Sequence, residues 1–243
     1  MLSIILPSYN EEKMIPIAAK RLGEILSPEK IDYELLFVDD GSKDATLHNL
    51  KKLYAKQLCP VKIVSFSRNF GKEAAIYAGL SHAKGDLVCI IDADLQQRPE
   101  VVVEMLQVMA SDENIDCVAA YQENRKESKV MSGAKSAFYK IINKLAEVDF
   151  VNGASDFRLM SRTMVDTILS MTEYHRFSKG IFGWIGFKTY WLPYENVERV
   201  AGETKWSFWK LFRYAIDGII NFSQAPLSIA SWCGVGSTFA AFV

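Results

Sequence analysis

The chain has 243 residues, of which 49% are hydrophobic, so it can bury the core of one sizeable α/β domain. Its formal net charge of −1 excludes the global basic field that attracts nucleic acid, and we expect no nucleic-acid partner. The four cysteines form no Cys-x-x-Cys pair and have no histidine at metal-ligand spacing, which excludes a zinc site of that type.

Short apolar runs alternate with segments of helical periodicity through the first half of the chain. The runs predict strands at Leu2–Leu6, Tyr33–Val38, Val61–Phe66, Leu87–Ile91 and Asp116–Tyr121. The segments between them predict helices at Glu12–Leu26, Ala45–Lys56, Lys72–Ala83 and Pro99–Met109. This alternation is typical of an α/β protein with a Rossmann-like, mostly parallel sheet flanked by helices.

A polar sequence follows each of the first four predicted strands. In an open α/β sheet, ligands bind at the edge where the parallel strands have their carboxyl ends. We therefore expect the four sequences to form one site. They are Pro-Ser-Tyr-Asn-Glu at 7–11, Asp-Asp-Gly-Ser at 39–42, Ser-Arg-Asn-Phe-Gly-Lys at 67–72 and Asp-Ala-Asp-Leu-Gln at 92–96.

Asp92 and Asp94 come directly after the fourth predicted strand and indicate a metal site. Two carboxylates separated by one residue supply hard oxygen ligands for Mg²⁺ or Mn²⁺, and such ions share the rest of their coordination shell with substrate phosphates. Gln96 can add a third oxygen. The alternative is two solvated loop aspartates, but the position at the end of a buried strand favours the metal site.

The ends of the first and second predicted strands offer groups suited to a nucleotide. Pro7 shapes the turn, and Tyr9 supplies a ring for base stacking. Asn10 and Glu11 add polar groups. Asp40 can accept hydrogen bonds from the N–H groups of a pyrimidine or a guanine. The alternative is that it caps the helix from Ala45, a role that Ser42 or Asp44 could fill equally well, and both roles can hold together.

Donors for a diphosphate are expected at the same edge of the sheet. Arg68, Asn69 and Lys72 surround Gly71 in the third polar sequence. Their N–H groups are suited to phosphate oxygens, so we assign Lys72 to the nucleotide site.

The second half of the chain shows weaker patterns. Helices are predicted over 126–145 and over Ser161–Ser170, with a loop around Val151–Ser155. The segment Gly180–Leu192 is rich in glycine and aromatic residues and predicts irregular structure plus a strand.

The C-terminal region predicts contact with a membrane. Ser207–Gln224 has an amphipathic helical pattern, and we expect it to lie in the membrane interface. The uncharged stretch Ala225–Val243 is close to the roughly 20 apolar residues of a transmembrane helix, and we expect it to be the truncated start of one. The alternatives are a surface helix packed on the sheet and a buried C-terminal helix.

Five motifs in order resemble those of one enzyme family. The resemblance extends from Leu2 to Ser207 and is to the inverting glycosyltransferases with a GT-A fold, which include dolichyl-phosphate mannose synthase and the bactoprenol glucosyltransferases. The motifs are P-S-Y-N-E at 7–11, D-D-G-S-K-D at 39–44, S-R-N-F-G-K-E-A at 67–74, D-A-D-L-Q at 92–96 and G-A-S-D-F-R-L-M-S-R at 153–162.

The resemblance implies a division of the chain and a set of roles. It implies a GT-A catalytic domain over 1–204, an amphipathic juxtamembrane helix over 205–224 and the start of a transmembrane segment over 225–243. The implied site residues are Pro7, Tyr9, Glu11 and Asp40 for the nucleotide, Asp92, Asp94 and Gln96 for the metal, Asp156 for the catalytic centre, and Arg199 with Lys205 for a segment that closes on the phosphates. We count Asp94 as catalytic together with Asp156.

The charge of a phosphate acceptor determines the chemistry that we expect. A phosphomonoester has a second pKa of about 6, so its oxygen is already an anion at neutral pH and scarcely needs a general base. Asp156 is therefore expected to orient the acceptor phosphate, with proton abstraction the weaker option. Direct in-line attack would invert the anomeric carbon. The cations that could clamp the acceptor phosphate or the diphosphate, each of which could also be a solvated surface charge, are Arg125, Lys135, Arg199 and Lys205.

We expect a membrane-attached enzyme that transfers a sugar from a nucleotide diphosphate to a polyprenyl phosphate such as undecaprenyl phosphate. The resemblance of S-R-N-F-G-K-E-A and of the apolar C-terminal stretch to the bactoprenol glucosyltransferases implies that the donor is UDP-glucose. Lys205, Lys210 and Arg213 flank the apolar stretch and predict a catalytic domain on the cytoplasmic face of the membrane. The alternatives are a GDP-mannose-dependent polyprenyl-phosphate or dolichyl-phosphate mannosyltransferase, a transferase with a saccharide or protein acceptor, and a non-catalytic membrane-tethered nucleotide-binding module. The sequence leaves the sugar and a possible homo-oligomer open.

Overall fold

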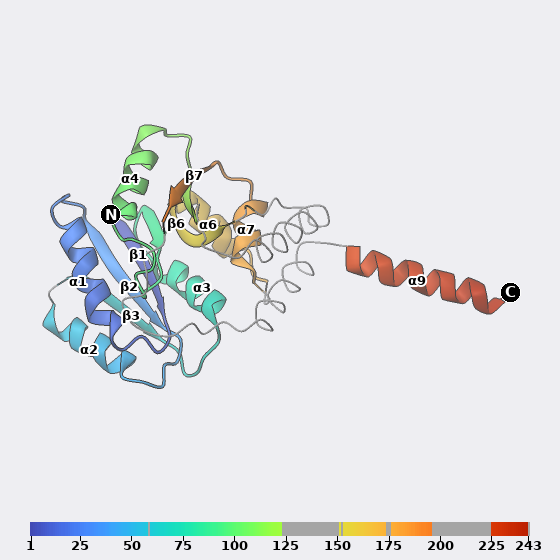
Figure 1. Ribbon diagram of the computed structural model, residues 1–243, viewed down its shortest axis with the longest axis horizontal. Helices are drawn as coiled ribbons and strands as arrows, with labels where there is room; N and C mark the ends of the chain where they lie inside the picture. The colour runs from blue at the N-terminus through green and yellow to red at the C-terminus, as the bar shows by residue number, and fades with distance from the viewer. Residues whose placement is uncertain (58, 123–150, 152, 174–175, 196–224, 243) are drawn as a thin grey trace.

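A computed structural model describes residues 1–57, 59–122, 151, 153–173, 176–195 and 225–242, and their main feature is one twisted sheet (Figure 1). Seven strands of the described residues pair in the order β3-β2-β1-β4-β6-β5-β7. The strands are β1 Leu2–Ser8, β2 Tyr33–Asp39, β3 Val61–Ser65, β4 Leu87–Ile90, β5 Cys117–Gln122, β6 Ala154–Ser161 and β7 Thr189–Tyr194. The helices are α1 Met14–Leu26, α2 Thr46–Lys56, α3 Lys72–His82, α4 Val101–Ser111, α6 Arg162–Ser170, α7 Ser178–Trp184 and α9 Ala225–Phe242.

The predicted α/β architecture with a mostly parallel sheet is confirmed. β1 pairs in parallel with β2 on one side and with β4 on the other, and β2 pairs in parallel with β3. The chain thus builds outward from β1 to β3 and then returns to the other side of β1 with β4. Ligands bind at such a reversal point in open α/β sheets, so the carboxyl ends of β1 and β4 mark the expected place of the site.

The predicted loop around residues 151–155 is wrong in part, because a strand begins within it. This strand, β6, lies between β4 and β5 and is antiparallel to both. Its side chains are buried on both faces of the sheet: Phe157 and Leu159 belong to one apolar cluster and Met160 to the other. A strand buried on both faces has little alternation of polar and apolar residues, so its signal in the sequence is weak.

Helices cover both faces of the sheet and divide the core in two. The first apolar cluster joins α1, α2 and α4 to one face, and the second joins α3, α6 and α7 to the opposite face. Neighbouring residues of β1 point into different clusters, Ile4 into the first and Ile5 into the second. Helix α7 was not expected, since the sequence predicted irregular structure over 180–192 before the strand that is now β7.

The C-terminal helix α9 lies apart from the sheet and its flanking helices (Figure 1). Large apolar side chains along it are exposed, with 73% of Leu227, 75% of Trp232 and 73% of Phe239 accessible to solvent. The predicted helices over 126–145 and 207–224 lie outside the described residues.

Within the described part of the chain, no helix has both the length and the apolar character needed to cross a membrane, so the expected start of a transmembrane segment over 225–243 is unsupported.

The contact between α3 and β1 predicts how the core responds to one added methyl group. A Cβ at Gly79 of α3 would lie 2.3 Å from Cγ2 of Ile5, which is buried in β1. Gly79→Ala should therefore lower the free energy of unfolding by about 1–3 kcal/mol, measured by urea denaturation.

Gly23→Ala in α1 is the matched control. A Cβ at Gly23 would meet only the Tyr33 hydroxyl, at 3.5 Å, which is ordinary contact. The higher helix propensity of alanine should then raise stability by up to about 1 kcal/mol. Equal effects of the two substitutions would contradict the close packing of α3 on β1.

Candidate active site

The loops that follow β1 and β2 are joined by hydrogen bonds at the carboxyl edge of the sheet. The Asn10 N–H donates to Ser42 Oγ at 2.9 Å, and Asn10 Oδ1 accepts from the Lys43 N–H at 2.9 Å. The Glu11 N–H donates to Thr46 Oγ1 at 2.8 Å. Asn10 has a left-handed φ of 54°, a conformation that asparagine adopts more readily than most residues. The expected nucleotide residues Asn10 and Glu11 are thus fixed next to the loop after β2.

Pro7 lies inside β1, where it pairs with Val38 of β2, and the prediction that it shapes the turn is wrong. β4 pairs with β1 only as far as Ile5, so the missing N–H of Pro7 interrupts no pairing with β4. β1 therefore continues to Ser8, and the half-buried Tyr9 is the first residue of the turn.

Asp40 connects the end of β2 to the loop before α3. Its carboxylate is buried and accepts from the Phe70 N–H at 2.7 Å and from the Gly71 N–H at 3.0 Å. Burial raises the pKa of Asp40, and these two backbone donors act in the opposite direction. The loops are in direct contact, because a Cβ at Gly41 would lie 2.3 Å from the backbone carbonyl carbon of Arg68. Two of the predicted polar sequences are thus brought together.

Asp40 does not cap the next helix, whose N-cap is Ala45. Helix α2 begins at Thr46, whose backbone N–H donates to Asp44 Oδ1 at 3.0 Å. The neighbouring Asp39 accepts from the Ser42 N–H and from the Ser65 hydroxyl, each at 3.0 Å. Asp39 and Asp44 therefore stabilise the loop, while the Asp40 carboxylate points to the segment before α3.

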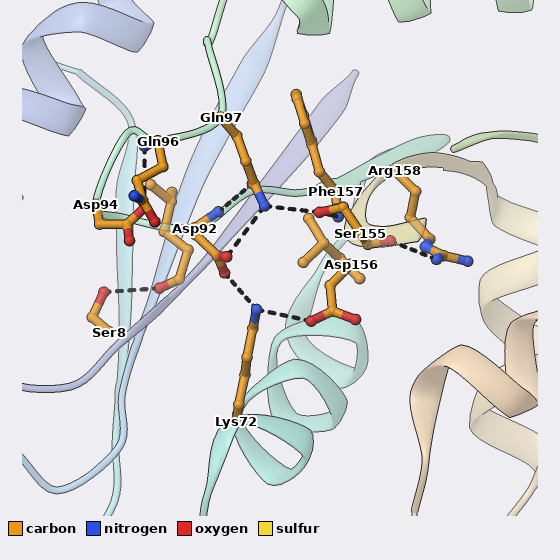
Figure 2. A network of polar contacts seen from close by, with 12 residues as sticks. Ser8, Lys72, Asp92, Asp94, Gln96, Gln97, Ser155, Asp156, Phe157 and Arg158 are labelled. Atoms are coloured by element: carbon orange, nitrogen blue, oxygen red, sulfur yellow. Dashed lines mark hydrogen bonds and ion pairs between the residues drawn. The ribbon is translucent and has the colours of Figure 1, made fainter. Parts of the chain in front are cut away.

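Lys72 joins three elements at the centre of the site (Figure 2). It is the first residue of α3, and its Nζ lies 2.7 Å from Asp92 Oδ1 and 2.8 Å from Asp156 Oδ2. Asp92 follows β4, and Asp156 lies near the beginning of β6. Because β6 runs antiparallel to β4, its beginning lies at the edge where β4 ends. The predicted catalytic aspartate and the first predicted metal ligand therefore share one ammonium group.

The charges around Asp156 keep it ionised. Burial by itself would raise the pKa of Asp156, but Lys72, Lys179 and Arg158 hold that pKa far below the ordinary value. Burial would likewise lower the pKa of Lys72, and the two carboxylates raise it well above its usual range. Among the described residues, Asp156 Oδ1 is a buried oxygen without a hydrogen-bond partner. Asp156 thus carries a full negative charge with one unused acceptor.

The loop after β4 holds the other two predicted metal ligands. Asp94 is 9% exposed, and its Oδ1 accepts from the Gln96 N–H at 3.1 Å across Leu95, which has a left-handed φ of 55°. In the described residues no three histidine, cysteine or acidic side chains are grouped so that they could enclose a metal ion. Two carboxylates and one amide nevertheless fit Mg²⁺ or Mn²⁺, which take few protein ligands and complete their shell with phosphate oxygens and water.

Gln97 fixes the position of Asp92, a role that was not predicted. Its Oε1 accepts from the Asp92 N–H at 2.9 Å, and its Nε2 donates to Asp92 Oδ2 at 3.2 Å. The same Nε2 donates to Ser155 Oγ at 3.0 Å (Figure 2). Gln97 is 5% exposed and therefore ties the loop after β4 to the beginning of β6. In the sequence, Gln97 is distinguished only by its position directly after Gln96, the predicted metal ligand.

Glu73 and Lys179 are further residues near the site that sequence reasoning did not identify. Glu73, next to Lys72 in α3, accepts from both the N–H and the hydroxyl of Ser178, the first residue of α7. Lys179 donates to the Ala154 carbonyl at 3.0 Å, which brings a second ammonium group to the beginning of β6. Helix α3 thus orients α7 as well as the two aspartates.

The cations assigned to the acceptor phosphate or the diphosphate, Arg125, Lys135, Arg199 and Lys205, lie outside the described residues and stay predictions.

Comparisons with known proteins agree with this fold. The model of the family "Glycosyl transferase family 2" matches residues 3–169. CsbB of Bacillus subtilis (strain 168), described as a glycosyltransferase, is 44% identical over 235 residues, which cover 97% of this chain and 70% of CsbB. The prophage bactoprenol glucosyl transferase homolog of Escherichia coli (strain K12) is 38% identical over 243 residues, which cover 100% of this chain and 78% of that protein.

The solved structures add a likeness of fold. Mannosyltransferase PcManGT from Pyrobaculum calidifontis superimposes with a TM-score of 0.62 at 20% sequence identity, covering 87% of this chain and 60% of that chain. The mostly parallel sheet, flanked by helices and with its carboxylates at one edge, defines a glycosyltransferase with a GT-A-like fold. The family match over 3–169 includes every strand from β1 to β6, and the chain belongs to glycosyl transferase family 2.

The contacts of Gln97 predict the effect of its replacement. Gln97→Met keeps the length of the side chain but leaves the Asp92 N–H and the Ser155 hydroxyl without this partner. A buried polar group without a hydrogen-bond partner lowers the free energy of unfolding by about 1–3 kcal/mol. Thermal and urea denaturation should therefore show a loss of stability of that size.

Gln107→Met on the exposed side of α4 is the matched control, and it should change stability by less than about 0.5 kcal/mol. If the Gln97→Met protein is as stable as the Gln107→Met protein, the hydrogen bonds of Gln97 to Asp92 and Ser155 do not contribute to stability.

Proposed function

We propose that the protein transfers glucose from UDP-glucose to a polyprenyl phosphate such as undecaprenyl phosphate, with inversion at the anomeric carbon. The observation that carries the proposal is the Asp92–Lys72–Asp156 network, at the sheet edge where the loops after β1, β2 and β4 meet. The name of the E. coli relative, a bactoprenol glucosyl transferase homolog, supports glucose and a polyprenyl acceptor.

Mg²⁺ or Mn²⁺ is proposed to bind Asp92, Asp94 and Gln96 together with the diphosphate of the donor. The donor set supports this, and PcManGT, a neighbour of the same fold, was solved with GDP-Man and Mn²⁺. When bound, the ion would act as a Lewis acid toward the leaving diphosphate. The protein contributes the orientation of these ligands, because Gln97 fixes Asp92 and the left-handed Leu95 places the Asp94 carboxylate against the Gln96 N–H.

Nucleotide recognition is proposed for Tyr9, Asn10, Glu11 and Asp40. The hydrogen bonds between the loops after β1 and β2 support this, since they fix Asn10 and Glu11 near the ends of adjacent strands. Asp40 accepts from two backbone N–H groups and still has a lone pair on each oxygen for a base.

Asp156 is proposed to orient the acceptor rather than to remove a proton. Its carboxylate is held ionised by neighbouring cations, and a phosphomonoester is already a dianion above pH of about 6. The attacking atom is then a phosphate oxygen, which forms a bond to the anomeric carbon while the bond from that carbon to the diphosphate oxygen breaks. Lys72 and Lys179 lie where they can reduce the repulsion between two anionic substrates.

Attachment to the membrane, with the catalytic domain on its cytoplasmic face, is proposed from the lipid acceptor. The exposed apolar side chains of α9, including Trp232 and Phe239, support contact with lipid. A polyprenyl phosphate remains in the bilayer, so an enzyme that uses it must work at that surface.

The proposal predicts a direct transfer reaction. Purified protein with Mn²⁺, radiolabelled UDP-glucose and vesicles containing undecaprenyl phosphate should produce labelled lipid. Asp94→Asn should reduce the rate by at least about 100-fold, because the ion loses a charged ligand in the transition state. Asp166→Asn, an exposed carboxylate of α6, should keep the rate and serve as the matched control.

A panel of donors separates this proposal from its alternatives. Transfer from GDP-mannose in place of UDP-glucose would identify a mannosyltransferase. No labelled lipid with any common UDP-sugar or GDP-sugar would remove the assignment, and nucleotide binding that Asp94→Asn leaves unchanged would then indicate a non-catalytic module. Co-flotation of the protein with the same vesicles tests its attachment to the membrane.

The charge state of Asp156 predicts the acidic side of the pH–rate profile. The lowered pKa of Asp156 means that its carboxylate stays ionised as pH falls from 8 to about 5, so its protonation cannot slow the reaction in that range. The acceptor phosphate does gain a proton near pH of about 6. The ratio kcat/KM for the acceptor should therefore fall below about pH 6, and a constant ratio down to pH 5 would contradict the proposed nucleophile.

A further inference from the structure

Both carboxylate oxygens of Asp92 have partners among the side chains of the protein itself. Oδ1 is 2.7 Å from Lys72 Nζ, and Oδ2 accepts from Gln97 Nε2 at 3.2 Å. The Asp92 backbone N–H donates to the same glutamine. Asp92 therefore cannot turn freely, and the Lys72 ammonium occupies the side from which a cation would approach Oδ1.

The other partner of Lys72 holds it in this position. Its Nζ is 2.8 Å from Asp156 Oδ2, and the Asp156 carboxylate is fixed near the beginning of β6. One ammonium group thus neutralises part of two carboxylates that would otherwise repel each other. An Mg²⁺ or Mn²⁺ ion binds carboxylate oxygen at about 2.0–2.2 Å, so at Asp92 Oδ1 it would come within a few ångströms of the ammonium group. Two like charges this close repel strongly in a partly buried site.

We propose that Lys72 is an internal counter-cation that occupies Asp92 until a sugar nucleotide arrives, so that the divalent cation binds weakly alone and tightly together with the diphosphate. This inference rests on the proposed function, because it assigns an order of binding to the same site. Lys72 can change partners: its side chain is 37% exposed, and lysine carries its charge on a flexible four-carbon stem.

Lys72 couples the binding of the divalent cation to the binding of the sugar nucleotide. A diphosphate offers Lys72 new anionic oxygens, and when the ammonium group turns toward them it releases Asp92 Oδ1 for the cation. Each ligand then favours the binding of the other by the same factor, as linkage requires. The Asp156 carboxylate keeps its remaining cationic neighbours, Lys179 and Arg158, during this exchange.

Titration with Mn²⁺ alone tests the inference. Free Mn²⁺ is measured by electron paramagnetic resonance in the presence of the full chain, without sugar nucleotide or lipid. Lys72→Met removes the competing charge and should bind Mn²⁺ about tenfold more tightly than the unsubstituted protein, a change of about 1.4 kcal/mol. Lys72→Arg keeps the charge and should bind it as weakly as the unsubstituted protein does.

Lys52→Met is the matched control, because Lys52 is an exposed lysine of α2 and its loss changes the net charge equally. It should leave the affinity for Mn²⁺ unchanged, and a gain equal to that of Lys72→Met would overturn the inference. Mn²⁺ binding by Lys72→Met that is no tighter than in the unsubstituted protein, or absent from both, would overturn it as well. If Lys72→Met does not fold, Lys72→Gln provides the same neutral side chain in a polar form.

The outcome is independent of the transfer assay. A failed transfer from UDP-glucose with tighter Mn²⁺ binding by Lys72→Met would overturn the proposed function and leave the counter-cation role of Lys72 in place. Successful transfer without that gain would overturn only the role of Lys72.

Discussion

The ion pairs of Lys72 with Asp92 and Asp156 are the interaction on which the site depends. They connect the end of β4, the beginning of β6 and the first turn of α3, three segments that are distant in the sequence. An ammonium group between two carboxylates stabilises both charges in a place where burial alone would disfavour them. The adjacent Glu73 binds Ser178 and extends the same support to α7.

The sheet order explains why these groups meet at all. After β3 the chain crosses to the other side of β1, so β1 and β4 lie side by side at the place where open α/β sheets bind ligands. The antiparallel β6 then adds a carboxylate from the start of a strand, where its parallel neighbours offer residues from their ends. Acidic groups from strands of both directions therefore lie at one edge of the sheet.

Local patterns predicted most of the fold and part of the site. The five expected strands and four expected helices of the first half are all present, because each depends on the periodicity of its own residues. β6 was missed because its residues are buried on both faces and its partners are remote. Gln97 was missed because its contacts with Asp92 and Ser155 depend on the conformation of the loop after β4, which the residue pattern of that loop does not show. The predicted roles of Asp92, Asp94 and Asp156 remain proposals.

The insertion of β6 between β4 and β5 has a consequence for how the enzyme matures. The register of β6 against β4 runs from Ser161 opposite Leu87 to Arg158 opposite Ile90, so this pairing joins residues about 70 positions apart. Contacts between residues so far apart in the sequence form slowly, because the chain loses the entropy of closing a large loop before the contacts stabilise it. A nascent chain can complete β1 to β4 and their helices while Asp156 is still absent from the sheet. Asp156 thus reaches Lys72 only when β6 pairs with β4, after the strands on both sides of β1 are already in place.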